Sequence, residues 1–289
     1  IDIWIAKKDS MGLGATYANL GEVYRLKTDY PEALKYFLLS LRIDEALQYE
    51  IGIAYAYNYL GATYQELGDY TKALENYQAA LEIRLRLGLD AGIAAGYNNI
   101  GTIYADEGKF AEALENYKAS LAIKEKIDDR YGMANTYINI GDVYHKQGDQ
   151  QEAMKYFSLA LKLQKDLEDQ EGMAATYIAM AASRIATKQY AEASSLLTKV
   201  VSISKEIGSL YYLRDGYATF AHLDSITGNH KQGLEHYKLY VAARDSITNE
   251  ENTRKLVETQ MQYDFDKKES LAKAEQDQKD FLALKAMQK

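Results

Sequence analysis

Small and apolar positions recur along this chain with a period of 40 residues. One glycine register contains Gly21, Gly61, Gly101 and Gly141. Two further registers keep the same spacing, at Gly12, Gly52, Gly92, Gly132 and Gly172 and at Gly68, Gly108, Gly148 and Gly228. A period of this length indicates a stack of identical supersecondary units.

Each copy has the pattern of a helical hairpin. In the first half of the second copy, Tyr57, Leu60 and Tyr64 are spaced three and four residues apart, which places them on one face of a helix. In the second half, Tyr77 and Leu81 belong to a stripe with the same helical spacing. Both stripes are predicted to be buried.

The segment between the two stripes predicts a tight turn. Gly68 can adopt a positive φ after a helix C-terminus, and Asp69 is placed to cap the next helix. Helices joined by about four residues pack antiparallel. Gly61 lies inside the first helix, where glycine costs about 0.5–1 kcal/mol relative to alanine. We therefore expect an aromatic ring of the partner helix to lie over its bare backbone.

The succession of aromatic, Leu-Gly, Tyr, Gly-Asp-Tyr, Ala-Leu and aromatic residues resembles the tetratricopeptide repeat, in a 40-residue variant. The resemblance covers residues 1 to about 247. It implies an all-α, right-handed superhelical solenoid of antiparallel helix hairpins. The last two copies depart from the pattern. Ala181 and Ala221 replace the glycine of the first helix, and Arg184 and Asp224 replace the tyrosine that follows it. Lys188 replaces the glycine of the turn.

The period also predicts the domain organisation. Residues 1–13 are expected to be the tail of a truncated upstream repeat. Six repeats are expected to follow, at about 14–53, 54–93, 94–133, 134–173, 174–213 and 214–247. Residues 248–289 contain no glycine or proline and predict one long helix that caps the array or acts as a linker.

The end of the chain resembles the linker that follows such arrays in Bacteroidetes-type membrane sensor proteins. The resemblance lies in the segment QMQYDFDKKESLAKAEQDQK and in the more apolar segment FLALKAM. This resemblance implies a following transmembrane helix, then a histidine kinase or nucleotide cyclase, and a periplasmic location for the repeats. The alternative is a solvated helix that only caps the array, which leaves a cytoplasmic location open. A weak heptad pattern in the same segment permits a homodimer through this helix.

Composition excludes several function classes. The net charge is −8 and acidic and basic residues are mixed, so no basic cluster is present that would track the phosphates of a nucleic acid. The chain contains no cysteine, which excludes disulfides and thiol chemistry. No apolar run approaches the roughly 20 residues that cross a bilayer, so we expect no membrane contact by this segment itself.

No catalytic residue, metal ligand or cofactor site is predicted. The four histidines lack metal-ligand spacing, and we expect them on the surface or in a groove. Gly101 and the pair Gly108-Lys109 differ from a phosphate-binding loop in spacing, and Phe110 stands where a Ser or Thr is required. The expected partner is therefore a protein or peptide, and this segment is not expected to be an enzyme.

The period also locates the candidate binding surface. In tetratricopeptide arrays, the first-helix columns that point away from the packing face line a concave groove. Asparagine suits such a groove, because its side chain offers a donor and an acceptor to an extended peptide backbone. The candidate peptide-binding residues in these columns are Tyr55, Asn58, Gln65, Asn98, Thr102, Asn135, Asp142, His145, Ile178 and Ile185.

Alternatives remain open for this surface. The asparagines, with Asn19, Asn99 and Asn139 one residue further round, can instead tie neighbouring helices together. Ile178 and Ile185 can receive an apolar side chain of a partner or be covered by the C-terminal helix. The columns lack the paired Lys and Arg of the clamp that grips the C-terminal carboxylates of chaperones.

The predicted function is therefore a binding scaffold within a larger signalling protein. A free-standing cytoplasmic adaptor or peptide-responsive regulator is the alternative.

Overall fold

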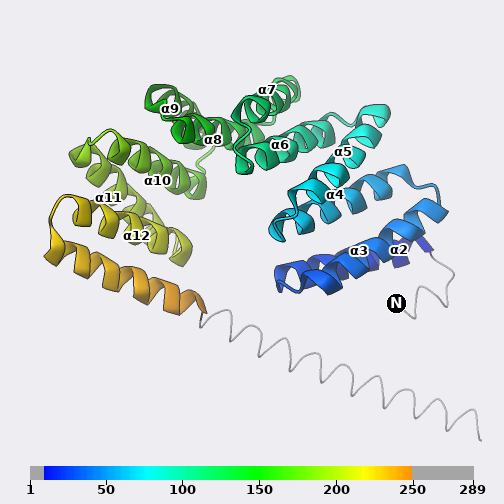
Figure 1. Cartoon of the computed structure of the whole chain (residues 1–289), viewed down its shortest axis with the longest axis horizontal. Helices are drawn as coiled ribbons and strands as arrows, with labels where there is room; N and C mark the ends of the chain where they lie inside the picture. The colour runs from blue at the N-terminus through cyan, green and yellow to red at the C-terminus, as the bar shows by residue number, and fades with distance from the viewer. Residues whose placement is uncertain (1–9, 249–289) are drawn as a thin grey trace, which may run out of the picture. The chain divides into compact units, whose positions relative to one another are not determined.

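A computed structural model describes residues 10–248, and every secondary-structure element in this range is helical (Figure 1). The helices follow one another in antiparallel pairs and form a solenoid, which confirms the predicted all-α class. Their bounds are α2 Ser10–Leu26, α3 Tyr30–Ala46, α4 Glu50–Glu66, α5 Tyr70–Leu87, α6 Asp90–Asp106, α7 Phe110–Lys126, α8 Arg130–Gln147, α9 Gln150–Asp166, α10 Gln170–Ala186, α11 Tyr190–Glu206 and α12 Leu210–Ile226, with a further helix over 230–248.

The chain divides into two compact units, and the boundary falls within α11, between Ala193 and Ser194. Each first helix begins before its predicted repeat boundary, as α4 does at Glu50 where the sequence predicted a boundary at 54. Residues 10–13 likewise form the first turn of α2. The predictions for residues 1–9 and for the C-terminal helix beyond residue 248 lie outside the described residues.

The turn chemistry within the hairpins is as the sequence predicted. Gly68 has a φ of 76° after the end of α4, a conformation that a side chain disfavours. Asp69 caps α5, and its carboxylate accepts a hydrogen bond from the backbone N–H of Lys72 at 3.2 Å. The same two devices, a left-handed residue and a capping residue, therefore end one helix and begin the next.

The glycines inside the first helices lie against aromatic rings of the second helices, which confirms the predicted close approach. A Cβ atom added to Gly61 would lie 2.7 Å from Cδ1 of Tyr77, and one added to Gly101 would lie 2.8 Å from Cδ1 of Tyr117. These rings are almost fully buried, with 3% of Tyr77 and 2% of Tyr117 exposed. The cores of the first four hairpins, at Gly21, Gly61, Gly101 and Gly141, are thus built on a ring that needs a bare backbone opposite it.

Within the first unit, the even-numbered helices lie on the inner side of the curved stack. α2 contacts α4, α6 contacts α8 and α8 contacts α10, whereas the odd-numbered helices from α3 to α9 make no comparable contacts with one another. In Figure 1, α6 and α8 accordingly lie inside α7 and α9. The candidate residues of the sequence analysis all lie on α4, α6, α8 and α10, on this inner side.

Candidate functional site

A column of buried polar side chains lies beneath the second glycine register. The members occur on successive second helices, each eight residues before a residue of that register, and their exposed fractions are at most 7%. They are Asp44, Arg84, Lys124 and Gln164. A Cβ atom on Gly92 would lie 2.9 Å from Cδ of Arg84, and one on Gly52 would lie 2.5 Å from Cγ of Asp44. The glycines therefore make room for polar groups that reach inward from the outer helices.

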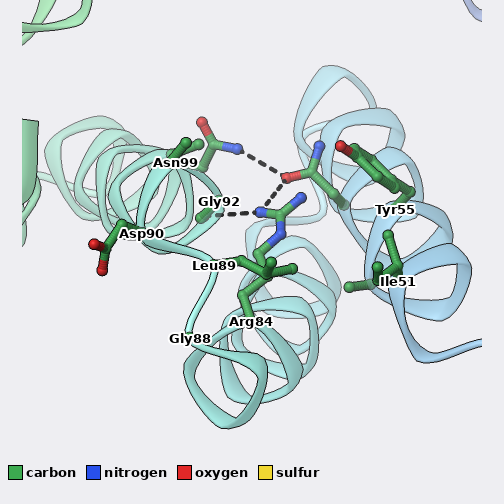
Figure 2. A pocket seen from close by; sticks show the side chains of 12 residues that line it. Ile51, Tyr55, Arg84, Gly88, Leu89, Asp90, Gly92 and Asn99 are labelled. Carbon is green, nitrogen blue, oxygen red and sulfur yellow. Dashed lines mark hydrogen bonds between the residues drawn. The ribbon is translucent and has the colours of Figure 1, made fainter. Parts of the chain in front are cut away.

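Within this column, Arg84 on α5 connects to two further helices, α4 and α6. One of its terminal nitrogens, Nη1, donates to Oδ1 of Asn58 on α4 and to the carbonyl oxygen of Gly92 on α6, both at 3.2 Å. The Asn99 amide on α6 donates to the same Asn58 oxygen at 3.3 Å. Figure 2 shows the guanidinium rising from α5 between the two inner helices.

The hydrogen-bonded group of Arg84, Asn58, Gly92 and Asn99 is called the Arg84 node below. A cavity of about 780 Å³ lies above this node, between α4, α5 and α6. Its walls carry apolar side chains that solvent reaches, with 56% of Tyr55, 38% of Ile51 and 36% of Leu89 exposed. Its floor carries Arg84 and Asn58. Apolar walls with a few convergent polar groups are typical of ligand sites in proteins.

Among residues 10–248, no carboxylate pairs with the charge of Arg84. Burial lowers the pKa of its guanidinium, and the nearby Tyr55 acts in the opposite sense. Asp90 also lines the cavity, but its carboxylate pairs with Nζ of Lys126 at 2.7 Å. In Figure 2 the Asp90 carboxylate points away from the guanidinium. The floor of the cavity is therefore cationic, although the chain as a whole is acidic.

The node recurs one repeat later with different side chains. Lys124 donates to Oγ1 of Thr136 at 2.8 Å and to the carbonyl oxygen of Gly132 at 3.2 Å. Thr136 and the Asn139 amide both donate to Oδ1 of Asn98, at 3.4 and 3.2 Å. The side-chain oxygens of Asn58 and Asn98 are thus engaged in joining helices, as one of the two interpretations held. Neither side-chain NH₂ group has an acceptor among the described residues.

Two other candidate side chains are also tied to neighbouring groups. The Tyr77 hydroxyl donates to Oε1 of Gln65 at 3.1 Å, and the Gln65 amide donates to Asp106 at 3.4 Å. Thr102 accepts from the Tyr117 hydroxyl at 3.1 Å. Both residues hold the inner helices against the core rings.

The remaining candidates lie further along the inner face. Asn135 on α8 is exposed, and Ile178 and Ile185 on α10 are half-buried. Burial raises the pKa of Asp142, while His145 and Lys146 act in the opposite sense. Tyr55 and Asn58 are the candidates that line the 780 Å³ cavity; the other eight candidates do not line it.

His236, which was expected on the surface or in a groove, pairs with a carboxylate in the second unit. Nδ1 of His236 lies 2.6 Å from Oδ2 of Asp224, whose side chain is buried, and its ring stacks on Phe220 at 4.5 Å between centroids. Asp224 occupies the register of the repeat tyrosines, so this departure from the pattern was the available signal.

Among residues 10–248, no group of three or more His, Cys, Asp or Glu side chains is arranged to hold a metal ion. No helix of the same range is long and apolar enough to cross a membrane.

Comparison with known proteins identifies a family signature. A family model described as tetratricopeptide repeat matches residues 12–86, 52–126 and 92–166, which together span more than half of the chain. No curated protein sequence matches significantly.

Solved structures share the fold at low sequence identity. Aspartyl phosphate phosphatase F from Bacillus subtilis has a TM-score of 0.68 and 14% identity, over 84% of this chain and 74% of its own. A Rap protein complexed with competence and sporulation factor has a TM-score of 0.63 and 14% identity, over 81% of this chain and 75% of its own. A signal transduction ATPase with a tetratricopeptide repeat sensor from Pyrococcus horikoshii has a TM-score of 0.67 and 17% identity, over 84% of this chain and 38% of its own.

Proposed function

Because the chain belongs to the tetratricopeptide repeat family, a family of protein-interaction scaffolds, we propose that it binds an extended peptide segment of a partner protein along its inner helices. The observation that carries this proposal is the cavity between α4, α5 and α6. It combines exposed Tyr55, Ile51 and Leu89 with polar groups on its floor. An extended peptide needs both, because its side chains require apolar contacts and its backbone requires hydrogen bonds.

The unused NH₂ groups of Asn58 and Asn98 support a backbone role. They occur at the same position of successive repeats, and each is a donor that a peptide carbonyl can satisfy. Tyrosine at the cavity wall adds apolar area at a low entropic cost, which is why aromatic residues recur at binding surfaces. The inner face therefore offers regularly spaced donors beside an aromatic wall.

A sensing role within a larger signalling protein is the finer proposal. It is supported by the composition of residues 250–289 and by the tetratricopeptide sensor of the Pyrococcus ATPase. No comparison points to a histidine kinase or cyclase in particular. A transmembrane segment and kinase or cyclase motifs encoded downstream of Lys289 would support the receptor, and their absence from the coding sequence would favour a free-standing adaptor.

Selection of peptides on the immobilised chain tests the binding function. A random library of blocked peptides is expected to yield binders that lose affinity at least about 10-fold with Tyr55→Ala, at an unchanged melting temperature. Leu38→Ala is the matched control, because Leu38 is 43% exposed on the outer helix α3. A library that yields no binders, or binders indifferent to Tyr55, would refute the proposal.

A further inference from the structure

Two buried charges of opposite sign lie one repeat apart beneath the inner face. Arg84 and Asp44 occupy the same register of α5 and α3, and each is 6% exposed. Each lines a cavity, of about 780 Å³ for Arg84 and about 330 Å³ for Asp44. Tyr55 lines both cavities and lies between them.

Neither charge is neutralised within the described residues. No Lys, Arg or His forms an ion pair with Asp44, and burial raises the pKa of its carboxyl, with the Ser40 hydroxyl acting in the opposite sense. No carboxylate pairs with Arg84. Removing an ion from water costs several kcal/mol unless a counter-charge and hydrogen bonds replace the water. Both sites therefore lack the partner that such burial normally requires.

The hydrogen bonds of Arg84 leave one edge of the guanidinium free. Both of its bonds come from Nη1, to Asn58 and to Gly92. The Nε and Nη2 groups have no acceptor among the described residues. This edge presents two parallel N–H donors, the geometry that binds both oxygens of a carboxylate. Gly92 packs closely against this side chain, since a Cβ atom there would lie 3.1 Å from Nε.

Asp44 offers the complementary group. Its carboxylate lies between two glycines, Gly14 and Gly52, where added Cβ atoms would lie 3.2 Å from Oδ1 and 2.6 Å from Oδ2. Three tyrosines line the cavity above it, together with Met11, Asn19 and small residues; the tyrosines are Tyr49, Tyr55 and Tyr59. Aromatic faces attract ammonium and guanidinium groups. This cavity is therefore suited to a basic side chain.

We infer that the two cavities recognise a pair of opposite charges on one extended peptide, with an acidic side chain seated against Arg84 and a basic side chain seated against Asp44. This specificity rests on the peptide-binding function proposed above. The inner face continues past Arg84 along α6 and α8, so the peptide extends in both directions and supplies a side-chain carboxylate rather than its C-terminus.

The repeat spacing sets the distance between the two charges on the peptide. Asp44 and Arg84 lie on α3 and α5, and each of these helices packs against α4, between them in the chain. Because packed helices lie about 8–10 Å apart and an extended chain advances about 3.3 Å per residue, the basic and acidic residues are separated by about three to six positions. Tyr55, between the two cavities, packs against the intervening residues.

A set of designed peptides tests this specificity on the full chain. Each peptide is about ten residues long, N-acetylated and C-amidated, with one Lys and one Glu at varied separation in both orders within an apolar host sequence. Binding is measured by fluorescence anisotropy. We expect tightest binding at one separation between about three and six residues, in one of the two orders, and at least about 10-fold weaker binding when the Glu becomes Gln. A free C-terminal carboxylate in place of the Glu is not expected to restore binding.

Variants of the chain assign each charge to its cavity. Arg84→Met retains side-chain length and is expected to abolish the Glu over Gln preference while keeping the Lys preference. Asp44→Asn is expected to do the reverse. Lys124→Met is the matched control, because Lys124 is an equally buried cation that lines neither cavity. Melting temperatures confirm that each variant is folded. Arg84→Lys keeps the positive charge but lacks the two parallel N–H donors of a guanidinium, so it is expected to bind at intermediate strength.

The outcomes separate this specificity from the general function. Binding that depends on Tyr55 but not on peptide charge would overturn the charge-pair inference and leave peptide binding intact. Equal loss with Arg84→Met and Lys124→Met would also overturn it, because the effect would then follow from burial of any cation. A stronger response to the free C-terminus than to the internal Glu would overturn the side-chain assignment. No binding by any peptide would overturn both proposals.

Discussion

Gly101→Leu tests whether a repeat is held together by the ring that lies against the glycine of its first helix, as in the first four hairpins. A Cβ atom at this position would lie 2.8 Å from Cδ1 and Cε1 of Tyr117 and 3.2 Å from the carbonyl oxygen of Ala113. Tyr117 is 2% exposed, so its ring cannot move toward solvent without opening the hairpin. The leucine therefore forces α6 and α7 apart.

The expected magnitude follows from two opposing effects. Overpacking a core typically costs about 1–3 kcal/mol, and leucine adds four carbons, which favours the upper part of that range. Replacing a glycine inside a helix gains up to about 1 kcal/mol. We expect a net loss of about 2 kcal/mol in the free energy of unfolding.

Urea denaturation followed by circular dichroism measures this loss. Hydrogen exchange then locates it in α6 and α7, because repeat arrays need not unfold in one step. Ala95→Leu is the matched control, since Ala95 lies on the same helix but is exposed, and we expect a change within about 0.5 kcal/mol. In a Tyr117→Ala background the cost of Gly101→Leu is expected to shrink. An unchanged urea midpoint, or an equal loss for Ala95→Leu, would refute this account.

Three further predictions concern caps, turns and pH. Asp69→Ala removes the acceptor for the Lys72 N–H and is expected to lower stability by about 0.5–2 kcal/mol in urea denaturation, whereas Lys109→Ala, at a cap without a side-chain bond, is expected to leave it unchanged. Gly148→Ala places a side chain at a φ of 85° and is expected to cost about 1–2 kcal/mol, visible as a lower melting temperature; an equal or higher one would contradict the turn assignment. Burial raises the pKa of Asp142 above 3.8, so its ionised form destabilises the fold at neutral pH, and this penalty is relieved as the pH falls through the raised pKa. Asp142→Asn is therefore expected to raise the melting temperature at neutral pH and to lose that advantage in acid; a gain that is independent of pH would contradict the assignment.

Much of the fold was predictable from the sequence because the repeat places equivalent residues in equivalent surroundings. Gly61 and Gly101 predicted a close approach of the second helix, and the rings of Tyr77 and Tyr117 lie there. Gly68 predicted a left-handed turn residue. Each of these features depends on a few residues near in sequence, so each leaves a periodic signal.

The sequence did not predict the buried polar residues beneath the candidate site, because their position holds a different residue type in each repeat. Asp44, Arg84 and Lys124 differ in charge and size, although all are buried in the same register. The available signal was indirect. The glycines eight residues later mark where these polar side chains need space, but their spacing does not identify the side chains. The predicted groove columns contain first-helix residues alone, whereas Arg84 and Lys124 reach the inner face from the second helices.

The amino-acid pattern alone specifies the helices, their turns, the packing of each hairpin and the columns that form the inner face. These follow from helical periodicity and turn chemistry, which act between residues close together in the chain. The pattern does not specify that the Asn58 oxygen meets Arg84, 26 residues away, and Asn99, 41 residues away. Those contacts depend on how successive hairpins stack, and burial at that junction leaves Arg84 with a charge that no residue of the described chain neutralises.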